Sequence, residues 1–326
     1  MGQRNPTVIR SRIEQLPDSG SVVYSHSMLQ EDILSRLSSG RAIVADGAMG
    51  TMLQAAGLPA GMSPEGWLLE NPDPVCNVHR AYIEAGADLI LTCTFGGTRA
   101  RLARKGLAER VAEVNRRAVE IARQAAGSRA CVAGDIGPLG EFLVPLGKLT
   151  YAQAVEIFAE QAAALAGAGV DVLYVETMSD LNEARAAVEG AQQAASGIPI
   201  FATLSFDSHG RTNMGVRPEQ AVETLLALGV TACGANCGAT LEMTAGAIAK
   251  MHETAPRAFL IAKPNAGKPR LVGQETVYDA TPDGMAEYAR KFLALGVRVV
   301  GGCCGSTPAH IAAIAAAVRS QVGQAF

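Results

Sequence analysis

Several features that would place a chain in a special class are missing from this sequence. No apolar run approaches the roughly 18 residues that a membrane-spanning helix needs. The polar stretch 1–20 lacks the apolar centre of a secretory signal. The formal net charge is only −3, which gives no electrostatic reason to expect a nucleic acid or an anionic membrane as a partner. We therefore expect a cytoplasmic protein that binds neither nucleic acid nor membrane.

Aromatic residues are also scarce, at 5% of the chain, so few side chains are available to form an aromatic cage around a quaternary ammonium group. The seven cysteines are an odd number in a long chain without an export signal. This argues against a disulfide framework and in favour of reduced thiols. Some of these thiols are then available to bind a metal or to take part in catalysis.

What the sequence does contain is a repeated alternation of strands and helices. Four helical stretches end in Gly, which suits the left-handed position after a helix, and an apolar run follows each at once. Eight runs in all are short, apolar and rich in β-branched residues, as strands buried on both faces should be. They are 42–46, 89–95, 130–135, 172–177, 198–206, 232–237, 258–265 and 299–304.

The helical stretches between these runs begin at recognisable caps. An N-cap residue followed by Pro, or a capping box, marks the starts at Asp73-Pro74, Thr281-Pro282, Thr307-Pro308, Thr150 with Gln153, and Asp180 with Glu183. Buried strands alternating with capped helices predict a parallel sheet. We predict a single-domain (β/α)8 barrel over 30–326, after a loosely ordered extension at 1–29. A doubly wound open sheet is the alternative, but the first run lacks the G-x-G-x-x-G turn typical of dinucleotide-binding folds.

Polar or sulfur-bearing residues follow every one of the eight runs. In a barrel, the C-terminal ends of the strands carry the active site. These ends are Asp46-Gly47, Thr92–Phe95, Asp135, Glu176-Thr177, Ser205–Asp207, Asn236-Cys237, Asn265 and Cys303-Cys304. The sequence therefore predicts a polar site at one end of the barrel.

Three cysteines stand at these strand ends. Cys237 closes the sixth run, and Cys303 with Cys304 closes the eighth, between glycines that let the backbone turn both sulfurs to one point. Three thiolates that converge on a cavity predict a catalytic zinc site with one open position. The alternative is that they are small buried hydrophobic residues. We adopt that alternative for the other four: Cys76, Cys93, Cys131 and Cys233.

A zinc ion held by three thiolates carries a net negative charge, so it activates water poorly but holds a soft sulfur ligand well. A free thiol has a pKa of about 8.5. Coordination would therefore supply thiolate at neutral pH and leave it electron-rich enough to attack. The chemistry that this site favours is alkylation of a thiol.

Six stretches of the sequence resemble the homocysteine S-methyltransferase family, and the likeness runs from about residue 30 to 320. They are DGAMGTML (46–53), AGADLILTCTF (85–95), VETMSDLNEA (175–184), ANCG (235–238), KPNAG (263–267) and GGCCGSTPAHI (301–311). The resemblance implies a (β/α)8 barrel with zinc on Cys237, Cys303 and Cys304, and homocysteine thiolate as the last ligand.

The resemblance also implies roles for four other residues. Asp46, Gly47 and Glu176 would hold the amino-acid end of the substrate. Asn265 would supply a fourth, oxygen ligand to zinc when no substrate is bound. The alternatives are a turn-forming Asp46 before Gly, a structural Glu176, and an Asn265 that simply closes a turn.

The family implies methyl transfer to homocysteine, giving methionine, but its members differ in the methyl donor. In betaine-dependent members a Tyr follows the Glu of the fourth strand, whereas this chain has Thr177 there, which speaks against betaine. We expect Trp67 to pack in the core. S-methylmethionine, a betaine or sulfonium compound, or a methyl-corrinoid protein stay open as donors.

Two alternatives to a stand-alone enzyme also stay open. The first is a homocysteine-binding subunit that accepts methyl from a separate corrinoid protein. The second is a non-catalytic barrel that binds zinc or thiols, against which the acidic residues beside the cysteines argue.

Overall fold

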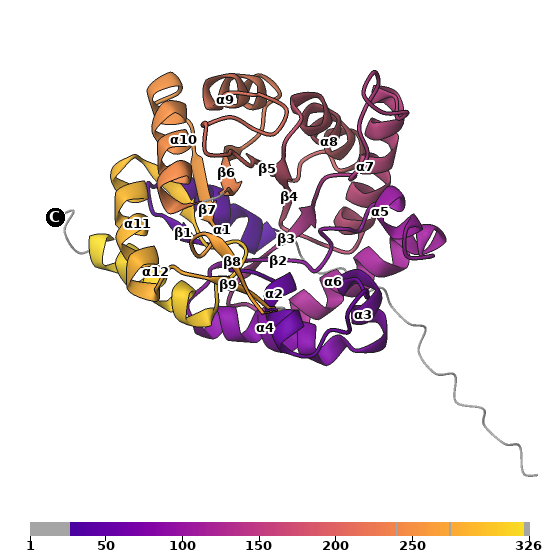
Figure 1. The fold of residues 1–326 in the computed structure, drawn as a ribbon, viewed down its shortest axis with the longest axis horizontal. Coiled ribbons are helices and arrows are strands. Elements are labelled where there is room, and N and C mark those ends of the chain that lie inside the picture. The colour runs from indigo at the N-terminus through magenta and orange to yellow at the C-terminus, as the bar shows by residue number, and fades with distance from the viewer. Residues whose placement is uncertain (1–26, 239, 274, 323–326) are drawn as a thin grey trace, which may run out of the picture.

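Eight parallel strands form a closed ring in the computed structural model, which describes residues 27–238, 240–273 and 275–322 (Figure 1). The strands lie in the order β1-β10-β7-β6-β5-β4-β3-β2, and a parallel bridge between Ala45 and Leu89 joins the first to the last. The predicted (β/α)8 barrel is confirmed. Of the predicted extension at 1–29, residues 1–26 lie outside the described part of the chain.

The barrel strands match the eight apolar runs, although most are shorter. They are β1 (Ile43–Val44), β2 (Leu89–Leu91), β3 (Cys131–Ile136), β4 (Val172–Met178), β5 (Ile200–Leu204), β6 (Ala232–Cys237), β7 (Leu260–Pro264) and β10 (Val297–Val300). The numbering skips because an antiparallel hairpin of β8 (Pro269–Val272) and β9 (Glu275–Tyr278) follows β7. The sequence analysis did not predict this hairpin.

Helices surround the ring of strands (Figure 1). They are α1 (Ser27–Ser38), α2 (Gly50–Ala55), α3 (Pro64–Glu70), α4 (Pro72–Glu84), α5 (Arg99–Ala103), the 3₁₀ helix η1 (Ala108–Arg110), α6 (Val111–Ala126), α7 (Tyr151–Gly167), α8 (Leu181–Ala194), α9 (Pro218–Ala227), α10 (Leu241–Thr254), α11 (Pro282–Ala294) and α12 (Pro308–Val322). No helix in the described parts of the chain is long and apolar enough to cross a membrane, and the expected cytoplasmic location stays a prediction.

Most of the predicted helix starts are confirmed. Thr150 and Gln153 form the capping box, Thr281 caps α11, and α12 begins at Pro308. The prediction for α4 was wrong, because this helix begins at Pro72 instead of Pro74. A proline fits anywhere in the first turn, where its missing N–H has no partner to lose, so the earlier proline opens the helix.

The predicted capping box at α8 does not form. Asp180 does cap the helix, accepting a hydrogen bond from the N–H of Asn182. The carboxylate of Glu183 instead accepts a hydrogen bond from the N–H of Leu139 at 2.8 Å. The carboxylate of Glu183 thus stabilises the loop after β3 instead of the helix start.

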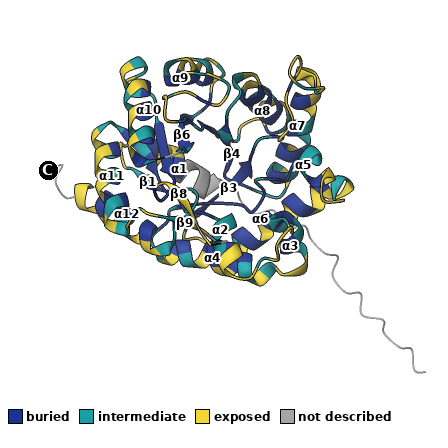
Figure 2. Cartoon of the chain, in the orientation of Figure 1, coloured by how far each residue is buried: buried dark blue, intermediate teal, exposed yellow. Residues whose placement is uncertain are grey.

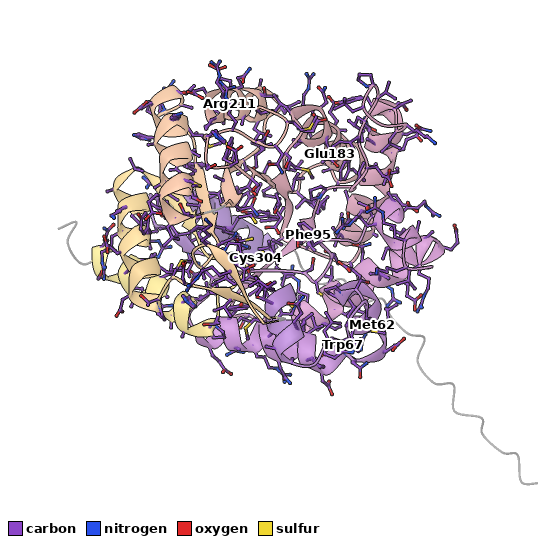
Figure 3. The ribbon with its side chains drawn as sticks, viewed as in Figure 1. Met62, Trp67, Phe95, Glu183, Arg211 and Cys304 are labelled. Atoms are coloured by element: carbon purple, nitrogen blue, oxygen red, sulfur yellow. The ribbon has the colours of Figure 1, made fainter. Side chains whose placement is uncertain are left out.

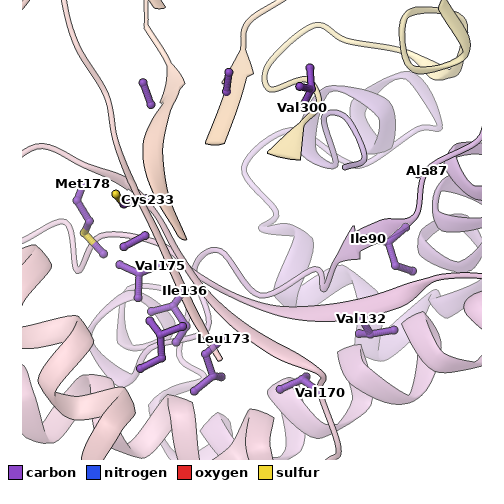
Figure 4. Packing of buried hydrophobic residues seen from close by; sticks show 14 of the residues in the cluster. Ala87, Ile90, Val132, Ile136, Val170, Leu173, Val175, Met178, Cys233 and Val300 are labelled. Carbon is purple, nitrogen blue, oxygen red and sulfur yellow. The ribbon is translucent and has the colours of Figure 1, made fainter. Parts of the chain in front are cut away.

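The strands bury both faces (Figure 2). Their outer faces pack on the helices, and Figure 4 shows part of this packing around Ile90, Val132 and Leu173. Their inner faces fill the barrel with apolar residues, including Ile43, Ala45, Leu89, Leu91, Cys131, Ala133, Val172, Tyr174, Phe201, Ala232, Ile261 and Val299. Trp67 is buried in the outer cluster, which confirms its core role.

Helix α1 closes the N-terminal end of the barrel. Ile33 and Leu37 belong to the same buried cluster as the inner faces of the strands. Arg36 pairs with Asp88, the residue before β2, at 3.0 Å between Nη2 and Oδ2. Figure 1 shows α1 in the middle of the ring. With that end filled, a cavity can open only at the C-terminal ends of the strands.

Candidate active site

The inner faces of the strands change from apolar to polar towards their C-terminal ends. Side chains of a strand alternate between its two faces, and alternate strands of a barrel supply the four members of each interior layer. Continued upward from the apolar layers, this pattern gives a layer of Asp135, Thr203 and Lys263, which Asp46 at the end of β1 joins through its ion pair with Lys263. The layer above it consists of Cys93, Glu176, Asn236 and Cys303.

A cavity of about 510 Å³ opens above these layers. Its walls include six of the seven predicted site residues, namely Asp46, Gly47, Glu176, Cys237, Cys303 and Cys304. The seventh, Asn265, does not line the cavity but follows β7 directly. Figure 3 shows two of the residues that line the cavity, Cys304 and Phe95, near the centre of the ring.

The structure brings the three predicted cysteines together. Their Sγ atoms all lie within 4.8 Å of one another. Cys237 has a φ of 59°, which is uncommon for a residue other than glycine, so β6 ends in a sharp turn at this side chain. Added side chains at Gly302 and Gly305 would collide with Ser306 and Tyr278. The glycines that flank the cysteine pair are therefore required by close packing.

The three sulfur atoms, here called the trio, shift one another's pKa values. Hydrogen bonds from Cys303 and then Cys304 lower the pKa of Cys237 to about 3. The same contact raises the pKa of Cys303, so of these two thiols Cys237 ionises more readily. Around zinc with Zn–S bonds of about 2.3 Å, tetrahedral geometry places sulfurs about 3.8 Å apart. Three soft donors within 4.8 Å of one another can converge on a zinc ion, although ligation stays a prediction.

Asn265 offers a further donor beside the trio. Its Nδ2 atom donates a hydrogen bond to the carbonyl oxygen of Gly238 at 2.6 Å. Its Oδ1 atom is buried and has no hydrogen-bond partner among the described residues. A buried amide oxygen without a partner is costly, so this atom is available to a metal or a ligand.

Glu176 is held by a network centred on Asn236. The Oδ1 atom of Asn236 accepts hydrogen bonds from Thr203 Oγ1 at 2.8 Å and from the N–H of Thr177 at 2.9 Å. Its Nδ2 atom donates to Thr177 Oγ1 at 2.7 Å and lies 3.4 Å from Glu176 Oε2. Burial raises the pKa of Glu176 to about 7. The network fixes Thr177, whose φ is 61°, and orients the carboxyl group beside it.

Asp46 is already paired inside the barrel. Its Oδ1 atom lies 3.1 Å from Nζ of Lys263, and its Oδ2 atom accepts the N–H of Leu91 at 2.8 Å. Burial alone would lower the pKa of Lys263, but the carboxylates of Asp46 and Glu176 raise it. The sequence analysis did not name Lys263 as a site residue. A charged residue inside the apolar run 258–265 was the available signal, because lysine is almost never fully buried without a partner.

Tyr278 is a second site residue that the sequence analysis missed. The ring of Tyr278 fills the space beside Gly305, and burial and then the nearby Cys304 raise the pKa of its hydroxyl group. Backbone bonds hold this end of the hairpin, from Ala280 N–H to the carbonyl of Ala266 at 2.9 Å. The hairpin thus covers the cysteine trio from one side.

The remaining four cysteines are buried, as predicted, and no disulfide links any of the seven cysteines, all of which are described. Only Cys93 of those four also borders the cavity. Glu65 and Arg101 also border the cavity: Glu65 Oε1 accepts the N–H of Gly96 at 2.6 Å, and the Arg101 guanidinium lies 5.8 Å from the centre of the Phe95 ring. The cavity is therefore lined by both the three cysteine sulfurs and the carboxyl groups of Asp46, Glu65, Asp135 and Glu176.

Known proteins resemble this chain in both sequence and fold. Residues 43–318 match the family homocysteine S-methyltransferase. Methionine synthase of Mycobacterium tuberculosis is 36% identical over 306 residues, which are 89% of this chain and 25% of that protein. The chain thus spans about a quarter of the length of that relative.

Solved structures of other proteins also resemble this chain in fold. The homocysteine methyltransferase MmuM from Escherichia coli, in its metallated form, matches with a TM-score of 0.73 at 27% identity, over 86% of this chain and 98% of that chain. A methyltransferase from Methanosarcina mazei, at 16% identity and a TM-score of 0.58 over 90% of this chain and 99% of that chain, shares the fold.

Proposed function

The chain belongs to the homocysteine S-methyltransferase family, and from that premise we propose that it transfers a methyl group to the thiol of homocysteine, giving methionine. One observation carries the proposal. Three Sγ atoms within 4.8 Å of one another border the same cavity as the buried carboxyl group of Glu176. A thiol that also carries an ammonium group fits that combination of sulfur ligands and a carboxyl group.

Each residue has a proposed part. Cys237, Cys303 and Cys304 would hold zinc, which when bound keeps the homocysteine thiol ionised at neutral pH. Asn265 would be the fourth ligand before substrate binds, since its Oδ1 atom lacks a partner among the described residues. Glu176 would accept charge-assisted hydrogen bonds from the substrate ammonium.

The end of the first strand contributes a glycine that leaves space at the cavity wall and a carboxylate that balances the charge of Lys263. A side chain at Gly47 would lie 2.7 Å from Ser306 Oγ and 2.8 Å from the Tyr82 ring, so only glycine fits at this wall of the cavity. Asp46 and Lys263 neutralise each other. We therefore assign less of the ammonium binding to Asp46 than to Glu176.

The proposed reaction is a direct displacement. The thiolate sulfur of homocysteine forms a bond to the methyl carbon while the bond from that carbon to the leaving group breaks. The leaving group keeps the electron pair of the broken bond, and the thiol proton has passed to solvent beforehand. The chain's own contribution is to hold sulfur and methyl donor in line inside the cavity.

A second candidate is favoured by the length of the relatives. The methionine synthase of M. tuberculosis extends over about four times the length that this chain covers. We therefore also consider a homocysteine-binding part that accepts methyl from a corrinoid carried on a separate protein or domain.

A panel of methyl donors tests both candidates. Purified protein would receive homocysteine with S-methylmethionine, dimethylsulfoniopropionate, glycine betaine or a methyl-corrinoid, and methionine would be measured by mass spectrometry. Methionine from a small donor supports the stand-alone enzyme, and methionine only with the methyl-corrinoid supports the second candidate. No methionine with any donor, together with no binding of homocysteine, would contradict the proposed function and leave a non-catalytic zinc-binding barrel.

A further inference from the structure

Asp135 is a buried carboxyl group that the proposed function does not use. It is the next-to-last residue of β3, only 6% exposed, and it borders the cavity. Its backbone is fixed on both sides. The N–H of Asp135 donates to Thr92 Oγ1 at 3.0 Å, and its carbonyl accepts from Thr94 Oγ1 at 2.7 Å and Gln161 Nε2 at 3.1 Å. The position of the carboxyl group is therefore set before any ligand arrives.

The side chain of Asp135 has no such support. Its Oδ1 atom is fully buried and has no hydrogen-bond partner among the described residues. Burial and then the neighbouring Glu176 raise the pKa of Asp135 well above its usual range. A buried carboxyl group without a partner is costly, and such a group in a cavity is poised for a ligand that donates hydrogen bonds or carries positive charge.

The other charged groups around Asp135 already have partners. Lys263 is the cation that lowers the pKa of Asp135, but its Nζ atom pairs with Asp46. Glu65 accepts the N–H of Gly96. Asp135 and Glu176 come from adjacent strands, and their side chains belong to adjacent interior layers. Both border the cavity, and neither carboxyl group forms an ion pair within the described chain, where Lys263 is paired with Asp46.

We propose that Asp135 and Glu176 together hold the ammonium group of homocysteine, with Asp135 taking the second-carboxylate role that the family resemblance gives to Asp46. The inference rests on the proposed function, because it names a second residue for the same substrate. An ammonium group has three N–H donors and no acceptor, so it can serve two carboxylates at once. One positive charge between the two acids also removes their mutual repulsion.

The arrangement makes the ammonium group a condition for tight binding. A thiol that lacks it leaves both carboxyl groups buried without a cation, and these must then be protonated. The cavity should therefore discriminate homocysteine from 4-mercaptobutyrate, which has the same thiol and carboxylate but no amino group. Asp135 is a binding and specificity residue in this account.

The test compares these two thiols by calorimetry on the zinc-loaded protein. Wild type should bind L-homocysteine more tightly than 4-mercaptobutyrate. Asp135→Asn should weaken the binding of homocysteine about ten- to a hundredfold, as expected for loss of a charged hydrogen-bond partner. It should not weaken the binding of 4-mercaptobutyrate. Asp135→Ser makes the same charge change in a smaller side chain, in case the Asn variant does not fold.

Glu183→Gln is the matched control, because Glu183 is a buried carboxyl group that does not border this cavity, and a glutamine can still accept the N–H of Leu139. It should change neither affinity. The inference would be overturned by an Asp135 variant that binds homocysteine as tightly as wild type does. It would also be overturned by a variant whose affinity falls equally for both thiols. Wild type that binds neither thiol would contradict the proposed function itself, which is a separate result.

Discussion

The Nζ atom of Lys263 lies 3.1 Å from Oδ1 of Asp46, and both side chains are about 3% exposed. The pair joins β7 to the end of β1 across the barrel interior. It also separates the acids of the cavity, because Asp46 is paired with a cation while Glu176 and Asp135 have no ion-pair partner in the described chain. We therefore expect the Lys263–Asp46 pair to stabilise the fold, and Glu176 and Asp135 to bind the substrate.

Removal of the lysine should destabilise the barrel. Lys263→Met leaves the Asp46 carboxyl group buried without its cation, which typically costs about 3–5 kcal/mol of unfolding free energy. The double variant Lys263→Met with Asp46→Asn should recover part of that loss. Urea unfolding of the two variants and the wild type measures both effects. Equal stability of Lys263→Met and wild type would show that the pair carries no such role.

The metal prediction concerns Cys304. Purified protein should hold about one zinc per chain, and Cys304→Ala should lose most of it while the barrel stays folded, because Cys304 lies at the cavity rim and not in the core. Metal analysis and circular dichroism together measure this. Full retention of zinc in a variant with Cys237, Cys303 and Cys304 all changed to Ala would rule out the assigned ligands.

Substrate binding should depend on Glu176. Glu176→Gln removes one charged partner of the homocysteine ammonium and should weaken binding by about 1.5–3 kcal/mol, while the zinc content stays unchanged. Calorimetric titration with homocysteine and a zinc assay on the same preparation measure the two effects. Unaltered affinity would mean that Glu176 does not contact the substrate, and lost zinc would mean that its role is structural.

The same carboxyl group predicts a pH dependence of stability. Burial raises the pKa of Glu176 to about 7 from an ordinary value of 4.5. Between these values the folded state holds a proton that the unfolded state has lost. The unfolding free energy of the metal-free protein should therefore fall as pH rises from about 4.5 to 7. Glu183, with a pKa also raised to about 7 by burial, adds to the same slope.

Glu176→Gln should flatten part of this slope, because glutamine does not titrate. Urea unfolding of wild type and variant at several pH values gives the comparison. Two parallel curves would show that Glu176 does not hold a proton in the folded state near neutral pH.

Much of the fold could be predicted from local sequence. Buried parallel strands need continuous apolar runs, and each helix needs a cap, so the eight runs and starts such as Thr150 were visible in the sequence. The cysteines were also visible, because their position directly after strands places them at one end of a barrel.

What could not be predicted depends on partners distant in the chain. Whether Asp46 is free or paired depends on Lys263, which is 217 residues away. That Asp135 lacks a partner is a property of everything around it. Tyr278 reaches Cys304 only through a short exposed hairpin, whose residues carry little apolar pattern.

The central claim is that homocysteine sulfur joins the three cysteine sulfurs on one zinc ion. Zinc X-ray absorption on the wild-type protein, with and without homocysteine, tests it most directly. The account predicts three sulfurs at about 2.3 Å and one oxygen or nitrogen without substrate, and four sulfurs once homocysteine is added. A sulfur count that stays at three when homocysteine is present would contradict thiol activation at this site.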